Sequence, residues 1–199
     1  MKQIKTFLKA ILAGIMINIA ATIYLSVEDS VVGALLFTFG LLGVLVTQSN
    51  LYTGMAGYFP QRKWWELILV FVGNGVGCIV YSLAYAQTTS YSKIYERVYQ
   101  LCERKFDAGV LGIFVMSICC GALMFLAVDT FKKNRDIVGV VVVILSVSGF
   151  ILAGFEHSIA NMAYLALAKY PVGIVELGKL LLMGIGNLIG AVGLRKMME

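Results

Sequence analysis

The sequence predicts an all-α membrane protein with six transmembrane helices, of which the second and the fifth are broken. Hydrophobic residues make up 60% of the 199 residues, and the mean hydropathy is +0.88. Water-soluble globular domains do not have this composition. Six apolar runs are each long enough for a bilayer crossing, which takes about 20 residues. The polar segments between the runs are short, so no room is left for a soluble catalytic domain.

The first three predicted spans cover residues 7–27, 31–59 and 66–86. Polar residues interrupt the middle of the second span: Thr47, Gln48, Ser49, Asn50 and Thr53. Non-helical backbone at membrane depth is tolerated only where it lines a cavity or is buried in protein. This cluster is therefore the first candidate for a break in a membrane helix.

The longest predicted loop covers residues 87–107. It contains three tyrosines spaced by four, Tyr91, Tyr95 and Tyr99, with charged residues among them. This spacing predicts an amphipathic helix that lies in the membrane interface. The fourth span follows at residues 108–128.

The fifth predicted span, residues 137–167, is too long for one straight crossing and contains the sequence GFEHSIANM. Its polar residues are Glu156, His157, Ser158 and Asn161, and His157 is the single histidine of the chain. Ionisable groups at membrane depth are costly and usually face a cavity or a partner. Two interpretations are open: polar side chains that hold neighbouring helices together, or a helix break that lines a polar path. The sixth span covers residues 171–194.

Basic residues favour one side of the predicted topology. Six spans place both termini on the same side, which collects ten basic residues, namely Lys2, Lys5, Lys9, Arg62, Lys63, Lys132, Lys133, Arg135, Arg195 and Lys196. The other side has five, and Lys179 lies within the sixth span. The positive-inside rule then predicts a multi-pass protein of the cell membrane with both termini in the cytoplasm. The net charge of +5 is a topology signal here and does not indicate nucleic-acid binding.

The cysteines predict neither a metal site nor thiol chemistry. Cys78, Cys102, Cys119 and Cys120 have no CxxC spacing, and one histidine cannot complete a zinc site with them. Buried structural thiols are the expected state. We expect no cofactor.

The two halves of the chain resemble each other. GNGVGCIV at residues 73–80 matches GNLIGAVG at residues 186–193, and the stretch 53–58 resembles 160–164. Because each half has three spans, the halves must insert in opposite orientations, which is typical of transporters and channels. We therefore predict a single domain, 1–199, with repeat 1 at about 1–87, the loop at about 88–107 and repeat 2 at about 108–199.

The stretches GFEHSIANM and NLYTGM, residues 50–55, resemble the signature sequences of the formate/nitrite transporter family, and ILAGIMINIA at residues 11–20 is also similar. The resemblance implies an aquaporin-like fold, a homopentamer with one pore in each protomer, and passage of small monovalent anions such as formate, nitrite or hydrosulfide. It implies pore and substrate-binding roles for His157, Asn161, Thr53, Glu156 and Lys105. It implies that Leu51, Phe155 and Tyr52 form the constrictions. Asn50 stands where the family often has glutamate, which puts the substrate preference in doubt.

The predicted mechanism depends on His157. Moving a bare anion from water into an apolar constriction costs up to tens of kcal/mol. Protonating the anion of an acid with a pKa near 4 at pH 7 costs only about 4 kcal/mol. His157 therefore either donates a proton to the anion or holds the anion by hydrogen bonding; desolvation favours its neutral form. Lys105 is expected to concentrate anions at the entrance, and its alternative is a solvated loop lysine. The rival function is a channel for a small neutral solute, such as urea or water. An enzyme is not expected, because one histidine, one buried glutamate and scattered amides do not converge on a reaction centre.

Overall fold

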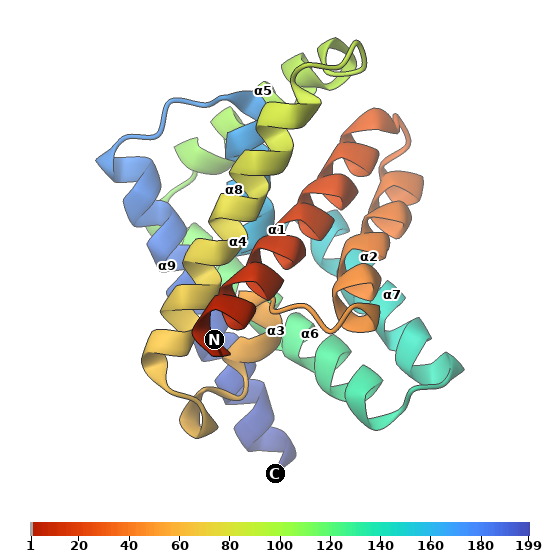
Figure 1. Cartoon of the computed structure of the whole chain (residues 1–199), viewed down its shortest axis with the longest axis vertical. Helices are drawn as coiled ribbons and strands as arrows, with labels where there is room; N and C mark the ends of the chain where they lie inside the picture. The colour runs from red at the N-terminus through yellow and green to blue at the C-terminus, as the bar shows by residue number, and fades with distance from the viewer. Residues whose placement is uncertain (1) are drawn as a thin grey trace.

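The computed structural model describes residues 2–199, and these residues form helices joined by short turns, with no strand among them (Figure 1). The helices are α1 (Lys2–Ser26), α2 (Ser30–Val46), α3 (Tyr52–Ala56), η1 (Phe59–Gln61), α4 (Trp64–Tyr85), α5 (Ser92–Asp107), α6 (Val110–Lys133), α7 (Ile137–Leu152), α8 (Ser158–Ala168) and α9 (Ile174–Met198).

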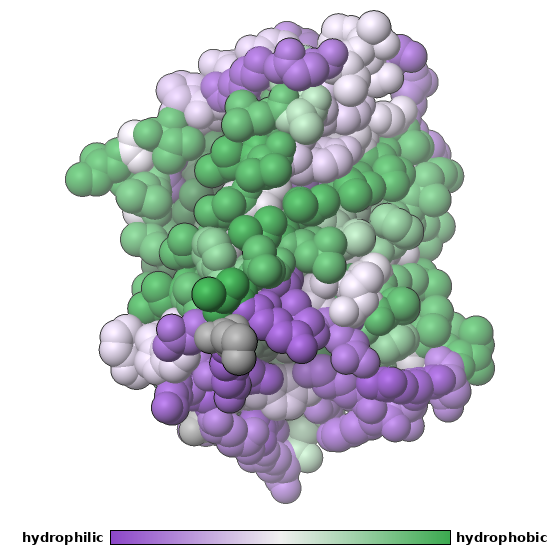
Figure 2. All heavy atoms as spheres, in the orientation of Figure 1, coloured by the Kyte–Doolittle hydropathy of each residue, from purple (hydrophilic) through white to green (hydrophobic). Residues whose placement is uncertain are grey.

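Four of these helices, α1, α4, α6 and α9, are long and apolar enough to cross a membrane. The helices α2, α7 and α8 are apolar but shorter. Many large apolar side chains are exposed, and on the face seen in Figure 2 they form a broad band between two hydrophilic ends. Such a band matches the hydrocarbon layer of a bilayer, where exposed apolar side chains cost nothing. The fold is that of a multi-pass membrane protein.

The start of α1 and the end of α9 both lie in the half of the molecule away from α5 (Figure 1). We call the end with the termini the terminal side and the end with α5 the far side. The predicted amphipathic helix is present as α5 and packs against α8 and α1. Arg97 of α5 donates hydrogen bonds to the backbone carbonyls of Leu25, in the last turn of α1, and of Val27, just after α1; the Leu25 bond is 3.0 Å long. The loop is thus a fixed part of the fold.

The helix pairs α1–α4 and α6–α9 pack through glycines. An added Cβ at Gly77 of α4 would lie 2.1 Å from the carbonyl oxygen of Ile11. At Gly190 of α9 it would lie 1.9 Å from the carbonyl oxygen of Ile118. Both distances are far inside van der Waals contact, so only glycine allows these backbones to approach. The match between GN-containing segments therefore reflects the same close contact in each half.

The predicted second and fifth spans are each built from two helices. The interruptions cover residues 47–51, between α2 and α3, and residues 153–157, between α7 and α8. Each contains one residue in the left-handed backbone region, Gln48 with φ 52° and Gly154 with φ 71°. The helices before the interruptions also begin alike: the carboxylate of Asp29 caps α2, and that of Asp136 caps α7. The two halves thus share their helix starts and their interruptions.

Candidate functional site

The first helix interruption is held by Asn74, the asparagine of the GN segment in α4. Its Oδ1 accepts a hydrogen bond from the backbone N–H of Tyr52 at 2.9 Å. Its Nδ2 donates to the carbonyls of Asn50 and Ala10, both at 2.8 Å. The amide therefore pairs backbone groups on both sides of Leu51 that the broken helix leaves without a helical partner.

Asn187 of α9 does the same for the second interruption. Its Oδ1 accepts from the N–H of Ser158 at 3.0 Å, and its Nδ2 donates to the carbonyls of Glu156 and Ser117, both at 2.8 Å. Asn74 and Asn187 are both fully buried. Each fixes the peptides around one N-cap residue, Leu51 for α3 and His157 for α8.

The imidazole of His157 is buried and has both nitrogens occupied. Its Nδ1 accepts a hydrogen bond from the N–H of Ala160 at 3.1 Å, which caps α8. Its Nε2 lies 3.0 Å from Oγ1 of Thr53 in α3. Because Nδ1 accepts, the proton of the neutral ring is on Nε2 and is donated to Thr53. The hydroxyl proton of Thr53 can therefore be donated to a third group. The ring of Phe150 stacks on the imidazole, with ring centroids 5.4 Å apart.

Glu156 faces a different set of partners. Its Oε2 accepts from Nδ2 of Asn161 at 2.6 Å and from Nζ of Lys105 at 2.8 Å. The side chains of Lys105 and Glu156 are only 16% and 8% exposed. The alternative of a solvated loop lysine is therefore wrong for Lys105, because α5 carries it into the protein against the second interruption.

A small cavity of about 90 Å³ lies on the far side of the interruptions. Its lining includes His157, Asn161, Lys105 and Phe155. The remaining lining is mostly aromatic and aliphatic, so the polar groups of the site meet an apolar wall there.

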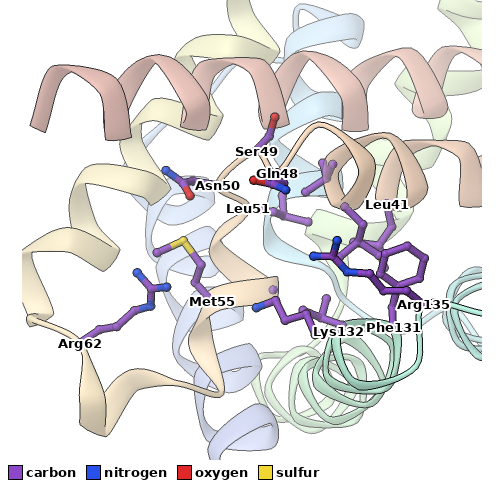
Figure 3. A pocket seen from close by; sticks show the side chains of 14 residues that line it. Leu41, Gln48, Ser49, Asn50, Leu51, Met55, Arg62, Phe131, Lys132 and Arg135 are labelled. Atoms are coloured by element: carbon purple, nitrogen blue, oxygen red, sulfur yellow. The ribbon is translucent and has the colours of Figure 1, made fainter. Parts of the chain in front are cut away.

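A second cavity, of about 180 Å³, opens at the terminal side between α2, α3 and α6 (Figure 3). Leu51 is 2% exposed and lies at its inner end with Met55. The two cavities share no lining residue. Between them lie the N-cap residues Leu51 and His157, and the Thr53–His157 hydrogen bond joins the two halves at this point.

Five of the eight predicted site residues line one of the two cavities: Leu51, Lys105, Phe155, His157 and Asn161. Thr53 and Glu156 line neither, but they form hydrogen bonds to residues of these five. The structure places Tyr52 away from both cavities: its hydroxyl donates to the carbonyl of Gly184 at 3.0 Å, and its ring packs edge-on against Phe71. Residues 2–199 contain no group of three histidine, cysteine or carboxylate side chains that could hold a metal ion.

Two sets of residues at the site were not predicted from the sequence. The asparagines of the GN segments were recognised only as a repeat, although a buried amide in an apolar run is itself a signal that backbone groups need partners. The second set lines the terminal-side cavity and was interpreted as a topology signal: Arg62, Lys132 and Arg135.

Comparison with known proteins gives concordant matches. A family described as "Formate/nitrite transporter" matches residues 1–199. The chain is 28% identical over 196 residues to the formate channel FocA of Escherichia coli K12, with 86% of this chain and 67% of FocA covered. It is 26% identical over 220 residues to the uncharacterized transporter YwcJ of Bacillus subtilis, with 96% and 86% covered.

Solved structures agree with these matches. A pentameric formate channel with formate bound superposes with a TM-score of 0.84 at 26% identity, covering 99% of this chain and 96% of the channel. An FNT family ion channel has a TM-score of 0.81 at 20% identity, covering 95% and 86%, which supports the fold.

Proposed function

Because this chain belongs to the formate/nitrite transporter family, we propose that it carries small monovalent weak-acid anions, of the formate, nitrite or hydrosulfide kind, across the cell membrane. It is a transport protein and not an enzyme. The matched channel is pentameric and binds formate, and we assign a homopentamer with one pore in each protomer here. The observation that carries the proposal is the Thr53–His157 pair, which joins two helix interruptions between two cavities.

The chain forms one domain of two inverted repeats, 1–87 and 108–199, joined by the segment 88–107. The shared helix starts, interruptions and asparagine contacts support this division. With α2–α3 and α7–α8 counted as one crossing each, six crossings place both termini on one side. Basic residues concentrate there, which assigns the terminal side to the cytoplasm.

The anion path runs between the two cavities. From the terminal side an anion meets Leu51 first, then the hydroxyl of Thr53 and the imidazole of His157. On the far side Phe155 forms the second apolar constriction, and Lys105 with Asn161 forms the polar entrance. With the ring N–H of His157 donated to Thr53, the free hydroxyl proton of Thr53 can hold an anion by hydrogen bonding without a fixed charge that would trap it.

The cap geometry supports one way in which His157 could couple to protons. A neutral ring with its proton on Nε2 is no acid near neutral pH, so proton donation requires the imidazolium form. The second proton belongs on Nδ1 and displaces the N–H of Ala160, which costs about 1 kcal/mol as a lost cap. An anion about 4 Å from the imidazolium stabilises it by about 4 kcal/mol at an effective dielectric constant of about 20. We therefore assign a neutral resting histidine that leaves the cap and takes up a proton only when an anion is beside it.

Flux into liposomes with the purified protein tests the function. Internal pH is recorded while formate, nitrite, hydrosulfide, acetate or chloride is added, and urea swelling serves as the control. Fast signals with weak-acid anions and none with urea are expected. Swelling with urea and no pH signal with any of the anions would instead indicate a neutral-solute channel.

The variant His157→Asn separates the roles of the histidine. Asparagine is among the best N-cap residues, so α8 keeps its start while the titratable group is lost. We expect the variant to assemble and to lose proton-coupled uptake. Unchanged pH-dependent flux would remove His157 from the proton path.

A further inference from the structure

We propose that the terminal-side cavity is a binding site for a phosphate group, formed by Arg62, Lys132 and Arg135. This inference rests on the proposed function, because it takes the cavity to be the pore entrance. The phosphate is not carried through the pore. It occupies the entrance and competes there with the monovalent substrate.

The first argument is the charge of the cavity. Three cationic side chains approach it, from the segment after η1, from the end of α6 and from the turn that follows α6 (Figure 3). None of its described lining residues is a carboxylate. Arg62 has only a long contact of 3.8 Å with Glu66, and Arg135 forms no ion pair within residues 2–199. Lys132 lies 4.2 Å above the ring of Tyr58, which holds it at the cavity without neutralising it.

The second argument is the contrast with the far side. The one cation that lines the far cavity is Lys105, and it is paired with Glu156 at 2.8 Å. The far entrance therefore carries no net charge from this pair. The terminal-side entrance has two cations without a carboxylate partner among residues 2–199, Lys132 and Arg135, in addition to Arg62 with its long contact to Glu66. One monovalent anion needs one such cation, so the terminal side has more charge than the substrate alone requires.

The third argument concerns the chemistry and the size of the ligand. Arginine binds phosphate oxygens through two parallel hydrogen bonds, and lysine adds a point charge. The side-chain amide of Gln48 also lines the cavity and can donate to oxygen. At its inner end stands the buried side chain of Leu51, where a doubly charged group cannot shed its water. The cavity can thus hold a phosphate group that cannot pass the constriction.

Inhibition of formate flux by one-sided phosphate tests the proposal. The protein is reconstituted in phosphatidylcholine liposomes, and its orientation is read from protease access to a C-terminal tag. Inorganic phosphate on the terminal side is expected to lower the formate flux, and phosphate on the far side is expected to have no effect. A parallel preparation with phosphatidylglycerol and no free phosphate asks whether a lipid headgroup occupies the site instead.

Charge variants then assign the site. Arg135→Gln and Lys132→Gln are each expected to weaken phosphate inhibition about tenfold, the low end for hydrogen bonds to charged groups. Lys196→Gln, an exposed change on the same side outside the cavity, is expected to leave it unchanged. If formate flux is lost in phosphatidylglycerol liposomes and the same variants restore it, the site binds a lipid headgroup.

Several outcomes would overturn the proposal: no effect of either phosphate source, equal inhibition from both sides, or inhibition as strong as in the wild type in both Arg135→Gln and Lys132→Gln. A wild-type protein without any anion flux would instead refute the proposed function. The two failures are therefore distinguishable.

Discussion

Replacing Asn187 by leucine tests whether one side chain holds the polar centre in place. Asn187 is fully buried and pairs three backbone groups from α6, α8 and the second interruption. Leucine has a similar size but no polar atom. The carbonyl of Ser117 lies within α6 and keeps its helical partner, but the N–H of Ser158 and the carbonyl of Glu156 lose theirs.

The expected cost follows from these two groups. An unpaired buried backbone group costs about 1–3 kcal/mol, so Asn187→Leu should lose about 2–6 kcal/mol of unfolding free energy. Both groups flank His157, so the ring should leave its place beside Thr53. Anion flux per folded protein should therefore fall as well.

Thermal unfolding in detergent and liposome flux measure the two effects. Asn74→Leu is the matched variant, because it leaves the N–H of Tyr52 and the carbonyl of Asn50 unpaired in the other half. Ile189→Leu, an exposed change in α9, is the neutral control. We expect both asparagine variants to unfold at lower temperature than the wild type. An unfolding temperature of Asn187→Leu equal to that of the wild type would refute the assigned role.

Three further predictions concern neighbouring features. Lys105→Met should lower the free energy of unfolding by about 3–5 kcal/mol, because it leaves the buried charge of Glu156 without its cation. Adding Glu156→Gln should restore most of the unfolding temperature. No restoration would argue against the ion pair. Gly121→Ala should prevent stable folding, since its Cβ would lie 2.0 Å from a carbonyl oxygen of α9, whereas Gly112→Ala in the same helix meets nothing within 4 Å and should behave as wild type in size-exclusion chromatography. Cys102 should resist maleimide at neutral pH until the protein is unfolded in detergent, because burial raises the pKa of its thiol to about 12 and the thiolate is the reactive form; labelling of the folded protein in a variant with Cys102 as its single cysteine would contradict this.

Much of the architecture could be predicted from the sequence because bilayer physics constrains it. Apolar runs of the right length indicated the long helices, and polar clusters inside two runs indicated where the helices are interrupted. The four-residue spacing of the tyrosines predicted α5, and the structure shows their rings next to one another along its face, with Tyr91 and Tyr95 centroids 5.6 Å apart. These signals are local, and each is visible within about 20 residues.

The remaining features depend on contacts between distant residues. The sequence comparison aligned Thr53 with Ala160, but the asparagine contacts make Tyr52 equivalent to Ser158 and shift this alignment by one residue. Similarity among small apolar residues could not reveal the shift, because hydrogen bonds to α4 and α9 define it. The cationic cavity was missed for a similar reason. Arg62 lies about 70 residues before Lys132, and only the fold places both at one entrance.

The two N-cap positions are structurally equivalent, and this makes them exchangeable by design. The glycines, aspartates and asparagines that build the scaffold are shared between the halves. The caps themselves differ between the halves: the first has the apolar Leu51 and the second has the titratable His157. Exchanging them, as Leu51→His with His157→Leu, is the smallest change that would transfer the titratable cap from the second half to the first.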